Sequence, residues 1–150
     1  MRVLAFAASN SRRSINARLV RHAGEVLVSE VAPDATVRGL DLNDYEMPIY
    51  SIDRENEGGI PDPAHRFFEA IGAADALILS FAEHNGSYTV AYKNVYDWAS
   101  RIDAKVFQGK PMLAMSASPG RRGGAGVLGT VVATVPRFGA DLRDHFPVGP

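Results

Sequence analysis

The chain has 150 residues, of which 46% are hydrophobic and 22% are charged, and its 16 basic and 17 acidic residues leave a formal net charge of −1. These values predict one globular domain with a core of its own and give no electrostatic reason to expect nucleic acid or a membrane as partner. The chain has no cysteine, which excludes disulfides, thiolate nucleophiles and cysteine metal sites and agrees with a cytoplasmic location. We expect neither a targeting signal nor a membrane span, because the apolar runs are too short.

The elements predicted in chain order alternate between strands and helices. Residues 2–8 form a short apolar run that ends in small polar residues, which predicts a buried strand leading into a loop. An amphipathic helix follows and ends near Pro33, and a weakly alternating second strand covers 36–42. The apolar residues that recur at helical spacing in this helix are Leu19, Ala23, Val26 and Leu27.

The middle of the chain begins with a stretch that carries no periodic pattern. Residues 43–63 are rich in Pro, Gly, Asp and Asn, which predicts a long irregular connection of the kind that is often functional or mobile. A short helix over 64–73 and a clearly buried strand over 76–81 follow. A second helical stripe consists of Ala91, Val95, Trp98 and Ile102, of which we place Trp98 in the core.

The last elements complete an α/β pattern. A strand over 110–115, a helix and a final strand over 140–146 give the order β-α-β-α-β-α-β-α-β. The apolar stripe of this last helix consists of Val127, Leu128, Val131 and Val135. Strands that are apolar on both faces predict a parallel sheet with helices on both sides. The chain stops after its fifth strand, so we expect no closing helix over the outer face of that strand. Either the chain is truncated, or a partner subunit covers this face.

The first candidate site is the loop between the first strand and the first helix. Its hydroxyl and amide side chains lie at a helix N-terminus, where backbone N–H groups and the helix dipole favour a phosphate. The alternative is that Ser14 merely caps the helix and the rest is a polar turn. The loop is neither G-x-G-x-x-G nor G-x-x-x-x-G-K-[ST], which disfavours a Rossmann dinucleotide site and a P-loop nucleotidase. The candidate residues are Ser9, Ser11, Arg12, Ser14, Ile15 and Asn16.

Two further loops follow strands at the same edge of the predicted sheet. In the first, Asn85-Gly86 predicts a tight turn whose backbone can approach a flat polar ligand. In the second, glycines at 120, 123 and 124 permit close backbone contact. Ordinary strand-to-helix turns are the alternative in both. The candidate residues are Glu83, His84, Asn85, Gly86, Ser87 and Tyr88 in the first loop, and Ser116, Ala117, Ser118 and Gly120 in the second.

With these three motifs the sequence resembles the NADPH-dependent FMN reductase family, which includes flavin-dependent quinone, azo-dye and chromate reductases. The first loop matches the family's phosphate pattern at Ser9, Ser14 and Asn16, and it has Ala8 and Ser11 where the family usually has Gly and Arg. The stretch 83–88, continued by 93–94 and 97–98, resembles the flavin-ring loop and the helix after it, with Ala82 and His84 in place of Pro and Tyr. The third loop resembles the glycine-rich loop beside the ring.

The resemblance implies a flavodoxin-like, doubly wound sheet of five parallel strands in the order 2-1-3-4-5. It also implies non-covalent FMN bound by the three loops, a homodimer or homotetramer with the flavin near the interface, and ping-pong electron transfer. NADPH or NADH would be the donor, and a quinone, azo dye or other small molecule the acceptor. No catalytic side chain is required, because the flavin supplies the chemistry. Arg121 or Arg122 is a candidate contact for the 2′-phosphate of NADPH.

Three alternatives remain open from the sequence. The first is a flavodoxin-type FMN electron carrier without a nicotinamide site, although flavodoxins are typically far more acidic than this chain. The second is a reductase that releases FMN as a loose substrate. The third is a flavin-free nucleotide-binding regulator on the same fold.

Overall fold

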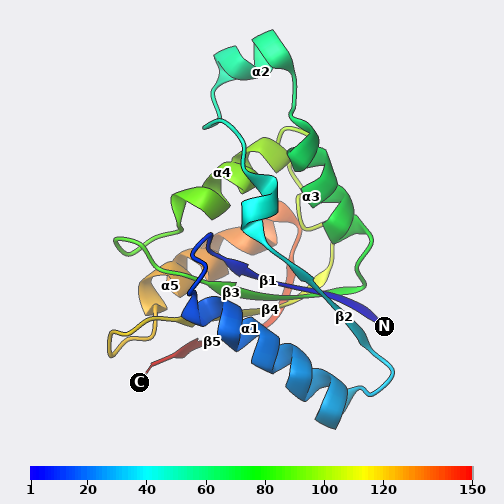
Figure 1. Ribbon diagram of the computed structural model, residues 1–150, viewed down its shortest axis with the longest axis vertical. Coiled ribbons are helices and arrows are strands. Elements are labelled where there is room, and N and C mark those ends of the chain that lie inside the picture. The colour runs from blue at the N-terminus through cyan, green and yellow to red at the C-terminus, as the bar shows by residue number, and fades with distance from the viewer. Residues whose placement is uncertain (150) are drawn as a thin grey trace.

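The computed structural model describes residues 1–149 and is built on one five-stranded sheet. All of its strand pairs are parallel, and the strands lie in the order β2-β1-β3-β4-β5 (Figure 1). This confirms the predicted flavodoxin-like α/β class and strand order. The strands are β1 (Arg2–Ala8), β2 (Thr36–Leu40), β3 (Ala76–Phe81), β4 (Pro111–Ala117) and β5 (Asp141–Val148).

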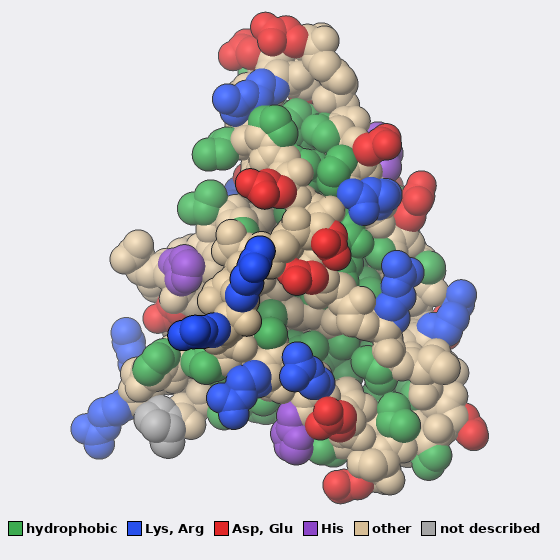
Figure 2. All heavy atoms as spheres, in the orientation of Figure 1, with side chains coloured by type: hydrophobic (Ala, Val, Ile, Leu, Met, Phe, Trp, Pro, Cys, Tyr) green, Lys and Arg blue, Asp and Glu red, His purple; other side chains and the backbone are tan. Residues whose placement is uncertain are grey.

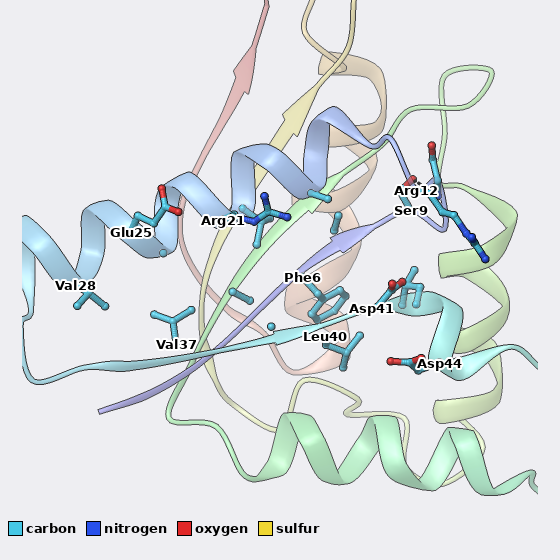
Figure 3. A pocket seen from close by; sticks show the side chains of 18 of the residues that line it. Phe6, Ser9, Arg12, Arg21, Glu25, Val28, Val37, Leu40, Asp41 and Asp44 are labelled. Atoms are coloured by element: carbon cyan, nitrogen blue, oxygen red, sulfur yellow. Dashed lines mark hydrogen bonds between the residues drawn. The ribbon is translucent and has the colours of Figure 1, made fainter.

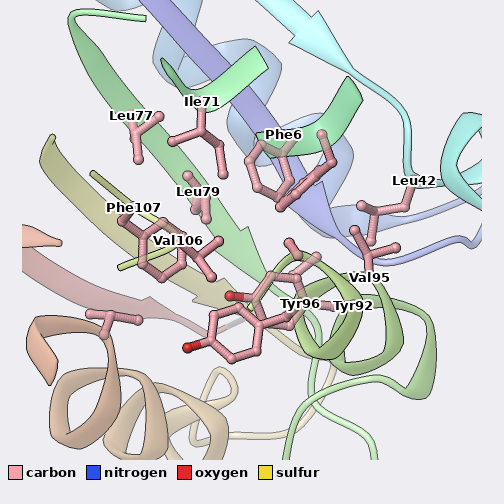
Figure 4. Close-up of a cluster of buried hydrophobic side chains, with 14 of the residues drawn as sticks. Phe6, Leu42, Ile71, Leu77, Leu79, Tyr92, Val95, Tyr96, Val106 and Phe107 are labelled. Atoms are coloured by element: carbon pink, nitrogen blue, oxygen red, sulfur yellow. The ribbon is translucent and has the colours of Figure 1, made fainter. Parts of the chain in front are cut away.

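Helices connect the strands and cover both faces of the sheet. On one face, Val20 of α1 packs with Val3, Ile78 and Met115. On the other face, α3, α4 and α5 enclose a larger cluster that includes Phe6, Leu79, Tyr92 and Phe107 (Figure 4). Trp98 is 1% exposed in this cluster, so its predicted core position is confirmed. The helices are α1 (Ile15–Val26), α2 (Ile52–Gly58), α3 (Asp62–Gly72), α4 (Val90–Ala99) and α5 (Ala125–Thr134).

The prediction of an irregular stretch over 43–63 is wrong. A 3-10 turn covers Leu42–Tyr45 and α2 covers Ile52–Gly58, which stands out from the body of the molecule (Figure 1). Each has an N-cap, since Asp41 accepts a hydrogen bond from the N–H of Asn43 and Ser51 accepts one from the N–H of Arg54. Helix α4 also holds this segment, because Trp98 Nε1 donates to the carbonyl of Pro48 at 2.8 Å.

The predicted element boundaries shift by a few residues elsewhere. The strand β2 ends at Leu40 because Asp41 already caps the following turn. Helix α3 begins at Asp62, before the predicted start, with a proline in its first turn where a missing N–H does no harm. Helix α1 continues into a π-helical turn over Leu27–Val31.

Burial falls off toward the β5 edge of the sheet. Most residues of β5 are exposed, and Phe146 retains 41% of its accessible surface. The central strands β1, β3 and β4 are buried along most of their length. Among the helices of residues 1–149, none has the length and apolar character needed to cross a membrane.

Candidate functional site

The three loops named from the sequence meet at one edge of the sheet. They follow β1, β3 and β4, which are adjacent and parallel, so their carboxyl ends lie together. We call them the first loop (9–16), the second loop (83–88) and the third loop (116–124). In an open parallel sheet this edge is where ligands bind.

The first loop presents backbone donors at the start of α1. Ser14 is the N-cap and accepts the N–H of Ala17 at 3.2 Å, and Ser9 Oγ accepts the N–H of Ser11 at 3.2 Å. Within residues 1–149, no acceptor pairs with the N–H groups of Arg12, Arg13, Ile15 or Asn16. Unpaired N–H groups at the positive end of a helix form an anion site. Ser14 therefore does cap the helix, and the neighbouring N–H groups stay available for a phosphate.

The side chain of Asn16 is engaged inside the protein. It is 2% exposed, and its Oδ1 accepts the Ser80 hydroxyl at 2.7 Å and the N–H of Ala117 at 2.8 Å. Its Nδ2 donates to the carbonyl of Ala117 at 3.0 Å. The carboxamide assigned to a phosphate from the sequence thus ties the start of α1 to the ends of β3 and β4. The backbone N–H of Asn16 has no partner within residues 1–149 and is left for a ligand.

A second internal tie comes from Thr89, which the sequence analysis did not select. Its hydroxyl donates to the carbonyl of Ala8 at 3.0 Å and accepts the N–H of Tyr92 at 3.2 Å, and the residue is 1% exposed. Thr89 therefore caps α4 and joins the end of the second loop to the end of β1. The sequence signal for this role is a threonine, a common N-cap residue, directly before the helical stripe of α4.

The second loop contains the predicted tight turn. The N–H of His84 donates to the carbonyl of Ser87 at 3.0 Å, and the N–H of Ser87 donates back to His84 at 3.1 Å. Asn85 and Gly86 have φ values of 52° and 79°, the left-handed pair of a type I′ turn. Their N–H groups have no acceptor in the described part of the chain. The exposed turn therefore offers backbone donors beside the first loop.

Tyr88 is directed into the protein. Its hydroxyl lies 2.8 Å from the Thr134 hydroxyl on α5, and its ring lies 5.1 Å from Tyr92 and 5.8 Å from Phe81 between centroids. Burial raises the pKa of Tyr88, so the phenol stays protonated at neutral pH. Tyr88 anchors the second loop on α5, and its hydroxyl is already paired.

The third loop closes tightly on itself. Ser116 is fully buried, and its hydroxyl donates to the carbonyl of Gly123 at 2.8 Å. Gly123 and Gly124 have φ values of 57° and 82°. A Cβ at Gly123 would lie 2.6 Å from the carbonyl carbon of Val148, so only glycine fits against the end of β5. Ser118 is half-buried, whereas Gly120, Arg121 and Arg122 are exposed.

Three hollows adjoin the loops. A groove of about 1010 Å³ runs between α1 and β2 from Ser9 and Ser11 at one end, and Arg12, Arg21 and Asp41 line it (Figure 3). No carboxylate of residues 1–149 lies within 4.0 Å of either arginine. Basic side chains gather over α1 and its N-terminal loop, with acidic ones among them (Figure 2). Another hollow, of about 840 Å³, lies against Ile15, Ala117 and Ser118. The last measures about 360 Å³, and its lining includes Asn10, His84 and Thr89.

The comparison with protein families decides the affiliation. The profile of the family described as NADPH-dependent FMN reductase matches residues 1–139. The chain belongs to the NADPH-dependent FMN reductase family. Among curated proteins, an NAD(P)H-dependent FMN reductase of Pseudomonas aeruginosa is 40% identical over 91 residues, which cover 61% of this chain and 45% of that protein. A quinone reductase of Escherichia coli is 30% identical over 103 residues, which cover 66% and 55% of the two chains.

Solved structures agree on the fold. A flavoenzyme NAD(P)H:acceptor oxidoreductase of Paracoccus denitrificans superposes with a TM-score of 0.76 at 24% identity, covering 95% of this chain and 74% of that one. A flavodoxin of Pseudomonas aeruginosa gives a TM-score of 0.61 at 16% identity, covering 99% and 84%. The chain spans about half the length of the curated relatives it matches.

Proposed function

We propose that this member of the NADPH-dependent FMN reductase family binds FMN without a covalent bond and transfers electrons from NADPH or NADH to a small acceptor. A quinone or azo compound is the expected acceptor class, since a curated relative is named quinone reductase and a protein of similar fold is named azoreductase. Bound FMN would supply the redox chemistry, namely transfer of a hydride equivalent from NADPH or NADH and then of two electrons to the acceptor, in a ping-pong sequence. The family affiliation and the unpaired donors of the first and second loops support this proposal.

The observation that carries the proposal is the set of unpaired backbone donors at the start of α1. The N–H groups of Arg12, Arg13, Ile15 and Asn16 would hold the phosphate, with the hydroxyls of Ser9, Ser11 and Ser14 around them. The Arg12 guanidinium would add a charge-assisted bond, because no carboxylate of the described chain pairs with it.

The other two loops would hold the ring. The unpaired N–H groups of Asn85 and Gly86 fit a polar ring edge, and His84 and Ser87 flank them on the exposed turn. Residues 116–120 would approach the opposite edge through their backbone, because the hydroxyl of Ser116 is already paired with Gly123. Glu83 and Tyr88 would act through the position of the loop, since both side chains bond to α5.

The proposal extends to assembly and location. We propose a homodimer or homotetramer in the cytoplasm. The exposed apolar side chains of Ile49, Ile52 and Val90 support the assembly, since exposed apolar side chains favour association. Sedimentation velocity of the purified protein tests it, and a monomer at all concentrations would refute it.

The first experiment is an absorbance spectrum of the purified protein with FMN, followed by anaerobic addition of NADPH and then NADH. We expect a protein-bound flavin band that bleaches on addition and returns with a quinone. A bound flavin that stays oxidised with both nucleotides would instead favour a flavodoxin-type electron carrier. FMN that passes freely through a desalting column would favour the loose-substrate reductase. Absence of any FMN binding would refute the proposal.

A further inference from the structure

The carboxylate of Glu83 reaches from the second loop to the start of α5. Its Oε2 accepts the N–H of Val127 at 2.7 Å. Val127 is the third residue of α5, a ten-residue helix whose N-cap, Gly124, has no side chain to accept a hydrogen bond. N–H groups in a first helical turn have no partner within the helix, and they carry the positive end of the dipole. Glu83 therefore supplies from another loop the cap that α5 lacks.

Gly126 leaves the space that this contact occupies. A Cβ at this position would lie 2.7 Å from Glu83 Oε2 and 3.4 Å from the carbonyl oxygen of Gly86. The first distance is too short for any real contact, whereas the second is ordinary van der Waals contact. The carboxylate and the tip of the turn thus both lie against the first turn of α5. A methyl group at 126 would displace the Glu83 carboxylate, whereas the turn of Asn85 and Gly86 could keep its position.

The second loop is attached to α5 at both of its ends. Glu83 bonds to Val127 at the start of the helix, and Tyr88 bonds to Thr134 at its end. Between these attachments lies the exposed turn of Asn85 and Gly86, whose N–H groups are unpaired within residues 1–149. The position of the turn relative to the third loop, which leads into α5, therefore depends on these contacts.

We propose that Glu83 is a positioning residue, with Gly126 as the residue that makes room for it, and that together they set the distance between the second and third loops. This inference rests on the proposed function in one respect, that a flavin ring lies between these loops. Glu83 acts through the backbone donors of the turn, which it holds in place against α5. Without the Glu83 carboxylate, the turn would still form, but its distance from the third loop would no longer be fixed.

The test combines substitutions at both positions. Glu83→Ala removes the carboxylate, Gly126→Ala displaces it, and Glu83→Gln keeps an oxygen acceptor for the N–H of Val127. Gly129→Ala is the matched control, because it lies in the same helix and a Cβ there would meet nothing within 4 Å. Both glycine substitutions favour the helix intrinsically, and the close approach to Glu83 Oε2 is what distinguishes Gly126→Ala from Gly129→Ala.

The first readout is amide hydrogen exchange of the protein without flavin. We expect the N–H of Val127 to lose protection in Glu83→Ala and in Gly126→Ala and to keep it in Glu83→Gln and Gly129→Ala. Because no flavin is present, this readout tests the contact even if the wild-type protein fails to bind FMN. Unchanged protection of Val127 in Glu83→Ala would overturn the inference.

The second readout is FMN affinity from fluorescence quenching. We expect about tenfold weaker binding for Glu83→Ala and for Gly126→Ala, a change of about 1.4 kcal/mol, and near wild-type binding for Glu83→Gln. In the Glu83→Ala background, Gly126→Ala should have no further effect, because the group it displaces is gone. An equal loss from Gly126→Ala in both backgrounds would overturn the inference, as would a Glu83→Gln variant as weak as Glu83→Ala.

Discussion

Replacing Asn16 by alanine tests whether its side chain is a structural tie or a phosphate ligand. The substitution removes three hydrogen bonds, of 2.7, 2.8 and 3.0 Å, that join the start of α1 to Ser80 and Ala117. It leaves the Ser80 hydroxyl and both backbone groups of Ala117 without these partners in a site where Asn16 is 2% exposed. A buried polar group that loses its partner costs about 1–3 kcal/mol. Because the lost partners belong to one network, we expect a total of about 3–5 kcal/mol rather than the full sum.

Urea denaturation of the flavin-free protein, followed by circular dichroism, measures this loss directly. Since domains are stable by only about 5–15 kcal/mol, Asn16→Ala should lower the urea midpoint strongly. The exposed Asn10 lies in the same loop, and Asn10→Ala should change stability by less than about 0.5 kcal/mol. In the double variant with Ser80→Ala, the loss should be smaller than the sum of the single losses. A loss below about 1 kcal/mol for Asn16→Ala would refute the reasoning and return its carboxamide to the list of phosphate ligands.

Three further predictions concern the first loop, a surface ion pair and the third loop. Ser11→Asp places a carboxylate among the unpaired donors at the start of α1, so it should weaken FMN binding at least tenfold. Riboflavin has no phosphate, so its binding should stay unchanged. An equal loss of affinity for both ligands in titrations would contradict a phosphate site. Arg2 donates from its backbone and side chain to Asp75, which lowers the pKa of that carboxyl to about 2 from 3.8. The pair therefore stabilises the fold above about pH 4 and loses its effect as the pH falls toward 2. Acid titrations of wild type and Asp75→Asn should converge over that window, and parallel curves would refute the assignment. Arg121→Ala with Arg122→Ala should reduce any preference for NADPH over NADH in steady-state kinetics, and an unchanged ratio would exclude these arginines from the 2′-phosphate.

The sequence predicts the parts of the fold that depend on local patterns. Buried strands such as 76–81, the N-cap at Ser14 and the tight turn at Asn85-Gly86 follow from residue type and period, and the structure confirms them. The stretch 43–63 escaped prediction because α2 has no buried residue and hence no apolar stripe. The contacts that support it, such as the bond from Trp98 to Pro48, join residues 50 positions apart. No local pattern shows such a contact.

The candidate site divides in the same way. Its loops were found from their position after strands, but the tasks of their side chains were not, because these depend on distant partners. Asn16 matches a phosphate motif and yet bonds to Ala117, 101 residues away. Glu83 follows a strand like a ligand-binding acid and yet bonds to Val127, 44 residues away. A single sequence gives residue types near a site, whereas the direction of each side chain is set by the packing of the whole sheet.

These observations lead to a common role for three polar side chains of the site that bond inside the protein. Asn16 ties the first loop to β3 and β4, Thr89 ties the second loop to β1, and Glu83 ties the second loop to α5. The groups left for a ligand are mainly backbone N–H groups, whose direction depends only on where the backbone lies. Such a site can change its exposed side chains without losing its donors, as where His84 stands in place of the Tyr that is usual in the family. Loss of one of the three ties would instead displace donors that the tying side chain does not itself supply.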